Sequence, residues 1–231
     1  MSRTQTPADG NTPAESRRCL QRGAEIVLAS HNAGKIREFS LLLAPLGIKI
    51  RSAAELNLPE PEETADSFEG NAEIKALAAA RATGLPALAD DSGFCVAALE
   101  GRPGVYSARW AGPERDMNVA MKRVHDEMVQ SGSADRGASF VAVLCLAWPD
   151  GQTRSVRGTC EGEVCWPPRG TGGHGYDPIF VPAVEIAASA GAASPEPRSF
   201  GQMSDEEKNR CSHRGRAMKR FVAECVAPPE T

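Results

Sequence analysis

The stretch ASFVAVLCLAWPDGQTRSVRGTCEGEVCW, residues 138–166, decides the fold of this 231-residue chain. Its apolar run, residues 140–148, shows no polar alternation, which is typical of a strand covered on both faces and therefore central in a sheet. The turn-forming residues 149–151 follow, and a more polar run completes the stretch. The stretch predicts an antiparallel β-hairpin with its first strand in the middle of the sheet.

Outward from this hairpin, strands and helices alternate along the chain. A capping box of Asp66 and Glu69 opens an alanine-rich helix, a second one of Ser204 and Glu207 opens a short helix, and Ser212 caps the last helix. Strands are expected at 25–30, 85–94 and 176–182, helices at 36–46, 66–84, 117–128, from 204 and from 212, and a loop at 183–200. Because the hairpin is antiparallel, we expect a mixed sheet with helices around it, in one α/β domain.

The composition restricts the classes of function. A net charge of −4 and a pI near 5.7 argue against a surface that coats nucleic acid, although local Lys and Arg residues can serve a small anionic substrate. Seven cysteines, an odd number with no C-x-x-C pair, predict free thiols in a reducing cytoplasm and give little support to a zinc site.

The ends of the chain and its apolar runs define the domain. Residues 1–22 are rich in Thr, Pro, Ser and Asn and lack the apolar core of a signal peptide, so we expect a disordered tail before a domain at 23–227. The longest apolar run, residues 140–148, is far shorter than the roughly 20 residues that span a bilayer. No membrane role is expected.

The segment RGTGGHGYDP, residues 169–178, fits the G-x-G-x-x-G pattern of dinucleotide-binding loops at its glycines 170, 172 and 175. That fingerprint requires a helix directly after the glycines, with its N-terminus facing a pyrophosphate. Here Pro178 disfavours helical angles at Asp177, and no helical period follows for some 25 residues. We therefore expect either a tight turn or a loop in which the backbone approaches a flat ligand, with His174 able to stack on it.

Three charged segments carry the candidate chemistry. SHNAGK, residues 30–35, leads from a strand into a helix and places Ser30, Asn32 and Lys35 where a helix N-terminus favours anions, although it is not a Walker loop. KNRCSHRGR, residues 208–216, places donors together near the start of the last helix. These donors suit an acceptor such as the O6 of an oxopurine, or are simply basic residues on an exposed helix.

The carboxylates form the third segment. Asp90 and Asp91 end an apolar strand, where they are either turn residues or ligands of a hard cation such as Mg²⁺. Their side chains should point to opposite faces of the strand, and the residues alone do not say which one faces a cation. The acidic run 60–69 is by default a solvated loop, from which one carboxylate can reach the same cation.

Taken together, these segments resemble the inosine triphosphate pyrophosphatase family. The matching stretches are LASHNAGKIREF, EETADSFEGNAEIKA, LADDSGFCVAALEGRPGVYSARWAG, GTGGHGYDPIF and MSDEEKNRCSHRGRAMK, in the order of the family and across about residues 25–225. The resemblance implies an elongated, two-lobed α/β fold with a long mixed sheet and a central cleft, a homodimer, and a cytoplasmic enzyme. It also implies Mg²⁺-dependent hydrolysis of ITP, dITP or XTP to the monophosphate and pyrophosphate, which removes deaminated purines from the nucleotide pool.

The resemblance also assigns roles to individual residues. Asp91 is the implied general base, and Glu62 and Asp91 are the implied metal ligands. The implied substrate-binding residues are Ser30, His31, Asn32, Ala33, Gly34, Lys35, Ser92, His174, Gly175, Tyr176, Asp177, Lys208, His213 and Arg214. Lys35 would contact the phosphates, and the residues from His174 onward would form the base pocket. Similar sequences usually carry Phe at position 174, so the effect of His174 on base affinity is open.

Two other functions compete with this one. A pyrophosphatase of broader specificity would also act on modified pyrimidines or canonical triphosphates, and a catalytically silent protein would only bind nucleotides. Donors that read O6 would favour ITP and XTP over ATP and CTP by a wide margin, because the wrong base leaves polar groups unpaired. Asp91 and Glu62 argue against a pure binding protein, which needs no hydrolytic base.

Overall fold

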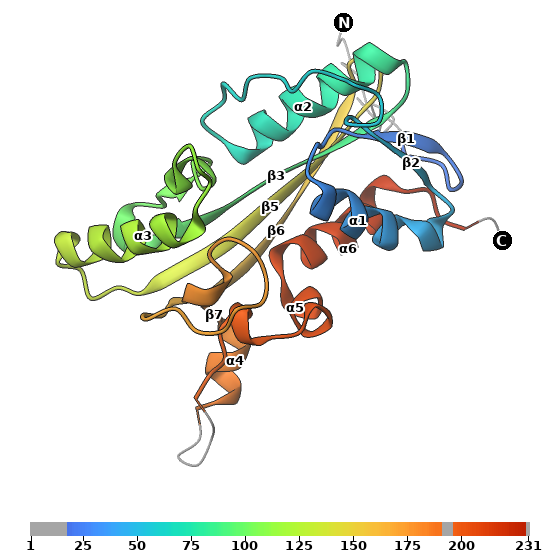
Figure 1. Cartoon of the computed structure of the whole chain (residues 1–231). Coiled ribbons are helices and arrows are strands. Elements are labelled where there is room, and N and C mark those ends of the chain that lie inside the picture. Colours follow the sequence, from blue (N-terminus) through green and yellow to red (C-terminus); the bar gives the residue numbers. More distant parts are fainter. Residues whose placement is uncertain (1–17, 191–195, 230–231) are drawn as a thin grey trace, which may run out of the picture.

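In the computed structural model, which describes residues 18–190 and 196–229, the stretch 138–166 forms the expected hairpin (Figure 1). Strand β5 (Gly137–Ala147) pairs antiparallel with β6 (Thr153–Val164), with Ala147 opposite Thr153 at the turn. Every residue from Phe140 to Trp148 is buried, because other elements cover both faces of β5. The prediction of a central first strand is confirmed.

The hairpin lies within a seven-stranded mixed sheet of order β2-β1-β3-β5-β6-β7, with β4 paired to β3. β1 is parallel to β2 and to β3, whereas all other pairs are antiparallel. The remaining strands are β1 (Glu25–Leu28), β2 (Lys49–Ser52), β3 (Ala87–Val96), β4 (Pro103–Gly104) and β7 (Phe180–Pro182). The predicted α/β class with a mixed sheet is confirmed.

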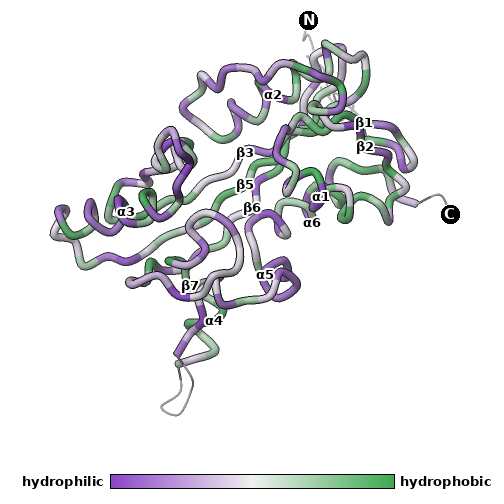
Figure 2. The backbone as a smooth tube through the Cα atoms, in the orientation of Figure 1, coloured by the Kyte–Doolittle hydropathy of each residue, from purple (hydrophilic) through white to green (hydrophobic). Residues whose placement is uncertain are grey.

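Helices cover both faces of the sheet. Helix α2 packs on β3 and β5 from one side, and α6 packs on β5 and β6 from the other. The α-helices are α1 (Ala33–Leu43), α2 (Phe68–Thr83), α3 (Met117–Ser131), α4 (Ala183–Ala188), α5 (Asp205–Cys211) and α6 (His213–Cys225). Short 3-10 turns lie at Ala44–Leu46, Ala97–Leu99, Arg109–Ala111, Asp177–Ile179 and Phe200–Gln202. Figure 2 shows hydrophobic residues along β5 and hydrophilic residues over much of α3 and α5.

The buried residues divide the molecule into two lobes along the long strands. At one end, two apolar clusters lie on opposite faces of the sheet, one around Phe39 and Phe221, the other around the alanines of α2. At the other end, a third cluster contains aromatic rings of β3, β5 and β7, with Phe94 and Phe140 4.9 Å apart. β3 and β5 run through both lobes, so residues midway along them lie where the lobes meet (Figure 1).

Several local predictions hold, and others need correction. Ser204 and Glu207 form the expected capping box, and Ser212 caps α6. The cap of α2 is Ser67 rather than Asp66, because the Ser67 hydroxyl accepts the N–H of Gly70. The predicted loop at 183–200 contains α4, whose alanine content favours a helix.

The predicted tail, residues 1–22, lies largely outside the described residues. Of its last part, which the structure describes, Leu20 is 2% exposed and donates its N–H to the Cys225 carbonyl at 2.7 Å. It also bridges Val226 in parallel. The ordered domain therefore begins before residue 23. Within the described ranges, no helix has the length and apolar character needed to cross a bilayer.

Candidate active site

A cavity of about 340 Å³ lies where the two lobes meet. It is walled by the N-terminal end of α1, the middle of β3, the 174–177 loop, α5 and the first turn of α6. Of the predicted substrate-binding residues, it gathers Asn32, Gly34, Lys35, Ser92, His174, Gly175, Tyr176, Asp177, Lys208, His213 and Arg214. Segments as far apart in the sequence as Asn32 and Arg214 thus share one site.

The N-terminus of α1 forms one end of this cavity. Asn32 caps the helix, and its Oδ1 accepts the backbone N–H groups of Gly34 and Lys35 at 2.9 and 3.1 Å. The Ser30 hydroxyl oxygen accepts the Asn32 N–H at 3.2 Å, so Ser30 shapes the turn. A helix N-terminus and an adjacent ammonium group favour an anion here. Ala33 is the first residue of the helix.

The 174–177 loop forms the opposite end around a buried carboxylate. Asp177 Oδ2 accepts the His174 N–H and the Lys208 ammonium, both at 2.5 Å. A Cβ at Gly173 would lie 2.1 Å from this oxygen, and Gly173 has a φ of +74°. The glycines therefore let Asp177 fold back onto the loop and hold Lys208, which leaves the His174 ring on the cavity wall.

Two rings of the cavity wall are fixed by packing. Tyr176 stacks on Phe94 with centroids 4.9 Å apart, and its hydroxyl donates to the Ser107 carbonyl. His213 stacks on Phe140 at 4.9 Å. Burial, with a smaller contribution from nearby cations, lowers the pKa of His213 well below its usual range, so the ring is neutral. Its Nδ1 is buried without a hydrogen-bond partner among the described residues.

The paired carboxylates lie inside β3 rather than at its end. Asp90 and Asp91 are 5% and 7% exposed, and this burial is tolerated because each is paired with a cation. They face opposite sides, as the alternation of a strand requires. Asp90 lies 2.6 Å from Lys35 on the cavity side, and Asp91 accepts from Lys75 at 2.8 Å on the side of α2.

Lys75 is a site residue that the sequence analysis missed. Its ammonium donates to Glu63 Oε1 at 2.6 Å, to Asp91 Oδ1 at 2.8 Å and to the Asp90 carbonyl at 3.1 Å. Burial works against its charged form, but Asp91 and Glu63 outweigh it and raise the pKa of Lys75. Burial likewise raises the pKa of Asp91, and Lys75 offsets only part of that effect.

Glu63 is the acidic side chain that shares Lys75 with Asp91, and the metal-ligand role that the resemblance implies for its neighbour Glu62 stays a prediction. Glu62 is exposed, whereas Glu63 is half-buried and shares Lys75 with Asp91. Sequence spacing does not decide which member of such a pair turns inward.

One edge of β3 pairs with no described strand from Ala89 to Gly93. β1 pairs with β3 at Ala87 and Leu88, and β4 pairs with it at Phe94 and Cys95. Between these pairs the strand edge meets the Lys75 ammonium, which binds the Asp90 carbonyl. The cavity and the Asp91–Lys75–Glu63 cluster therefore lie on either side of this stretch of β3.

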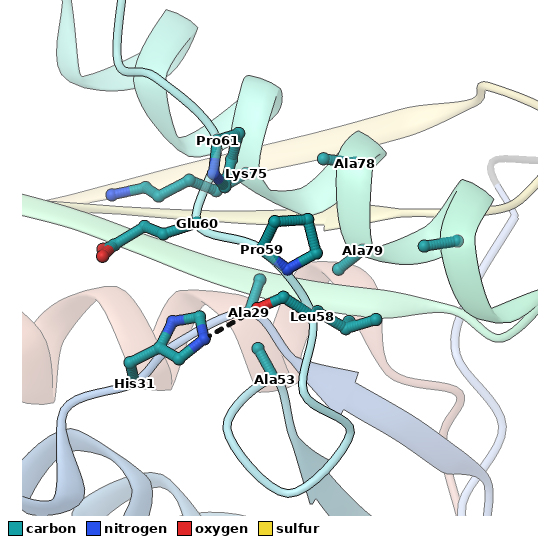
Figure 3. Close-up of a pocket in the computed structure, with 11 residues that line it drawn as sticks. Ala29, His31, Ala53, Leu58, Pro59, Glu60, Pro61, Lys75, Ala78 and Ala79 are labelled. Carbon is teal, nitrogen blue, oxygen red and sulfur yellow. Dashed lines mark hydrogen bonds between the residues drawn. The ribbon is translucent and has the colours of Figure 1, made fainter.

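His31 lies outside the large cavity. It lines a second cavity of about 100 Å³, walled mainly by alanines of α2 and by residues 58–61, and its Nε2 lies 3.0 Å from the Leu58 carbonyl (Figure 3). In that view the ammonium of Lys75 points away from the apolar wall. His31 thus contacts the 58–61 segment, and the predicted substrate contact of its side chain is not supported by this placement.

The residues around Asp91 fit a Mg²⁺ ion. Asp91 Oδ2 is buried and has no hydrogen-bond partner in the part of the chain that is described. The Glu63 carboxylate lies nearby, because the Lys75 ammonium donates to both Glu63 and Asp91. No cluster of three or more His, Cys, Asp or Glu ligands occurs within 18–190 and 196–229. Mg²⁺ commonly uses one or two carboxylates with water and substrate phosphates, so the donor set suits it better than zinc.

The fold and the site define an α/β protein with a nucleotide-sized cavity, with an anion-binding helix terminus at one end and buried rings and donors at the other. The Ham1 family model matches residues 26–224, and the chain belongs to this family. It is 64% identical over 209 residues to a dITP/XTP pyrophosphatase of Gluconobacter oxydans (strain 621H), covering 90% of this chain and 94% of that protein. The predicted family resemblance is confirmed.

Solved structures agree with this assignment. A HAM1 protein from Coxiella burnetii has a TM-score of 0.79 and 39% identity, covering 87% of this chain and 97% of that one. The nucleoside-triphosphatase, or dITP/XTP pyrophosphatase, from Mycobacterium abscessus has a TM-score of 0.67 and 37% identity, covering 86% and 98%. The fold is therefore that of these relatives over nearly their whole length.

Proposed function

We propose that this protein hydrolyses the non-canonical purine triphosphates ITP, dITP and XTP to the monophosphate and pyrophosphate. The observation that carries the proposal is that the large cavity and the Asp91–Lys75–Glu63 cluster flank the same stretch of β3, one edge of which pairs with no described strand from Ala89 to Gly93. The names of the relatives, dITP/XTP pyrophosphatases at up to 64% identity, support the same substrates.

The phosphates would lie at α1 and along the open edge. The first N–H groups of α1 and the Lys35 ammonium offset their negative charge, and Lys75 adds a second cation beside Asp91. Asp91 and Glu63 would hold Mg²⁺, which supplies charge neutralisation and lowers the pKa of a bound water. Asp91, whose Oδ2 has no partner among the described residues, orients the water and accepts its proton as the water attacks the α-phosphorus. Pyrophosphate then leaves.

The base would be read by donors at the far end of the cavity. Lys208 uses one of its three N–H groups on Asp177, which leaves two for an acceptor such as O6. His213 offers a neutral ring whose buried Nδ1 has no hydrogen-bond partner in the described part of the chain. Adenine presents an amine where oxopurines present O6, so it would leave these donors unpaired, at a cost of about 1–3 kcal/mol per group.

Pyrophosphate release from ITP, XTP, dITP, ATP, GTP and dUTP, with and without Mg²⁺, tests this proposal. We expect ITP, XTP and dITP to exceed ATP at least tenfold in kcat/KM, which is about 1.4 kcal/mol of discrimination, and chelation to abolish release. Equal rates on ATP and ITP would indicate the broader pyrophosphatase, and binding without release would indicate a silent nucleotide-binding protein.

Asp91→Asn tests the assigned base. We expect it to abolish turnover while ITP binding, measured by calorimetry, changes less than about tenfold. Full activity of this variant would remove Asp91 from the chemistry. Glu62→Gln and Glu63→Gln form a matched pair: loss of Mg²⁺-dependent activity is expected in the second and not in the first.

The homodimer and the cytoplasmic location implied by the resemblance remain predictions. Light scattering coupled to gel filtration tests the dimer, which would run at twice the 24.5 kDa of one chain. Fractionation of source cells tests the location.

A further inference from the structure

Asp90 has no part in the proposed reaction, yet its carboxylate lies among the substrate-binding side chains. Its Oδ2 lies 2.6 Å from Lys35 Nζ, accepts the Ser92 hydroxyl at 3.3 Å and lies 3.7 Å from Arg214 Nη2. These three partners come from α1, β3 and α6. One buried oxygen is therefore shared by elements that form different walls of the cavity.

The Asp90 carboxylate is buried beside two cations, Lys35 and Arg214. Its side chain is 2% exposed, and burial alone would favour the neutral acid. Lys35 and Arg214, at 2.6 and 3.7 Å, offset this cost of burial. An ammonium group has three donors, so Lys35 can keep its bond to Asp90 while it donates to a phosphate. Asp90 thus fixes the direction of a long and flexible side chain.

Glu38 provides an internal comparison. It pairs with Arg214 Nη1 at 2.9 Å from the neighbouring turn of α1, so Arg214 has one carboxylate on each side. Glu38 holds Arg214 at the α1 wall, whereas Asp90 holds Arg214 and Lys35 at the same oxygen. A change at Glu38 reaches one cation, and a change at Asp90 reaches both.

We propose that Asp90 is a positioning residue that couples the phosphate end of the site to the base end by holding Lys35 and Arg214 on one carboxylate oxygen. It does not touch the substrate. The inference rests on the proposed function, which places Lys35 on the phosphates and Arg214 at the base pocket. Its consequence is that the two cations do not act independently: moving one changes how Asp90 holds the other.

A double-mutant cycle tests the coupling. Lys35→Met and Arg214→Met are made singly and together, and kcat/KM for ITP is measured in the wild-type, Asp90→Asn and Glu38→Gln backgrounds. In the wild-type background, we expect the double variant to depart roughly fivefold or more from the product of the single effects, as for residues in one ion-pair network. The departure should persist with Glu38→Gln and fall below about twofold with Asp90→Asn.

The outcomes separate positioning from a general effect on the fold. Equal coupling with and without Asp90, or no coupling in the wild type, would overturn the proposal. Circular dichroism and melting curves report whether Asp90→Asn folds. If it does not fold, the Glu38→Gln background decides: coupling between Lys35 and Arg214 that persists there supports Asp90 as the remaining shared carboxylate. Loss of the coupling in that background would overturn the proposal.

Failure of the proposed function is distinguished by the wild type alone. If wild-type protein releases no pyrophosphate from ITP, the substrate assignment fails, and the same cycle is run on the affinity for inorganic tripolyphosphate by calorimetry. Arg214→Met should then change that affinity in the wild-type background and leave it unchanged with Asp90→Asn. An equal effect in both backgrounds would overturn the role of Asp90.

Discussion

Gly158 on β6 sets how closely α6 approaches the sheet, so Gly158→Ala should move part of the active site without touching it. A Cβ at this position would lie 2.2 Å from the His213 carbonyl oxygen and 2.3 Å from the Ala217 nitrogen. Ordinary contacts need about 3.5 Å, so α6 must retreat by about 1 Å. The backbone atoms that clash belong to the first turns of α6, which carry His213 and Arg214.

The expected cost has two parts. Overpacking of this kind destabilises by about 1–3 kcal/mol, and a 1 Å displacement of binding groups can lower kcat/KM about 100-fold. Urea unfolding and pyrophosphate release from ITP measure the two separately. Glu161→Ala, at an exposed position of the same strand, is the control and should change stability by less than about 0.5 kcal/mol. Unchanged stability and activity in Gly158→Ala would refute the close packing on which this reasoning depends.

Three further changes have defined outcomes. Lys75→Met should lower the free energy of unfolding by about 3 kcal/mol near neutral pH, because it leaves the buried Asp91 carboxylate unpaired. Added Mg²⁺ should then raise the melting temperature of this variant more than that of the wild type, and equal shifts would contradict the proposed metal site. His213 stays neutral in the folded state while the unfolded chain takes up a proton near pH 6.5, so its contribution to stability is complete above that pH and is lost as pH falls through the lower folded pKa. The slope, up to about 1.4 kcal/mol per pH unit, should disappear in His213→Asn, as pH-dependent urea unfolding can show. His174→Ala should raise KM for ITP by about 5- to 150-fold through loss of a stacking ring, and His174→Phe should restore it; an unchanged KM in the alanine variant would place the base elsewhere.

The sequence predicted the fold because its strongest patterns are local. The run 140–148 has no polar residue to place on an exposed face, and the caps at Ser204 and Ser212 act within a single turn. The same local rules failed where two neighbours compete for one role. At the start of α2, Ser67 is the cap in place of Asp66.

The candidate site was predicted as a set of residues, but its internal contacts were not. Lys75 was overlooked because a lysine in an alanine-rich helix is normally solvated. A signal was present: Lys75 lies seven residues after Phe68 and three after Ala72, on the face that α2 buries. Asp90 and Asp91 were expected at the end of a strand because burial of unpaired charge is costly. Their pairing with Lys35 and Lys75 depends on tertiary contacts that no local pattern contains.

The alternation of β3 has a consequence for how the gene can change. Asp90 faces the cavity and Asp91 faces α2 only because they occupy adjacent positions of a strand whose register places Leu88 opposite Leu146. A missense change at either position alters one side of the strand. Deletion of a single codon before Asp90 would shift every later side chain to the other face and exchange the two carboxylates. Substitutions in this strand are therefore tolerated more readily than insertions or deletions, which change its length.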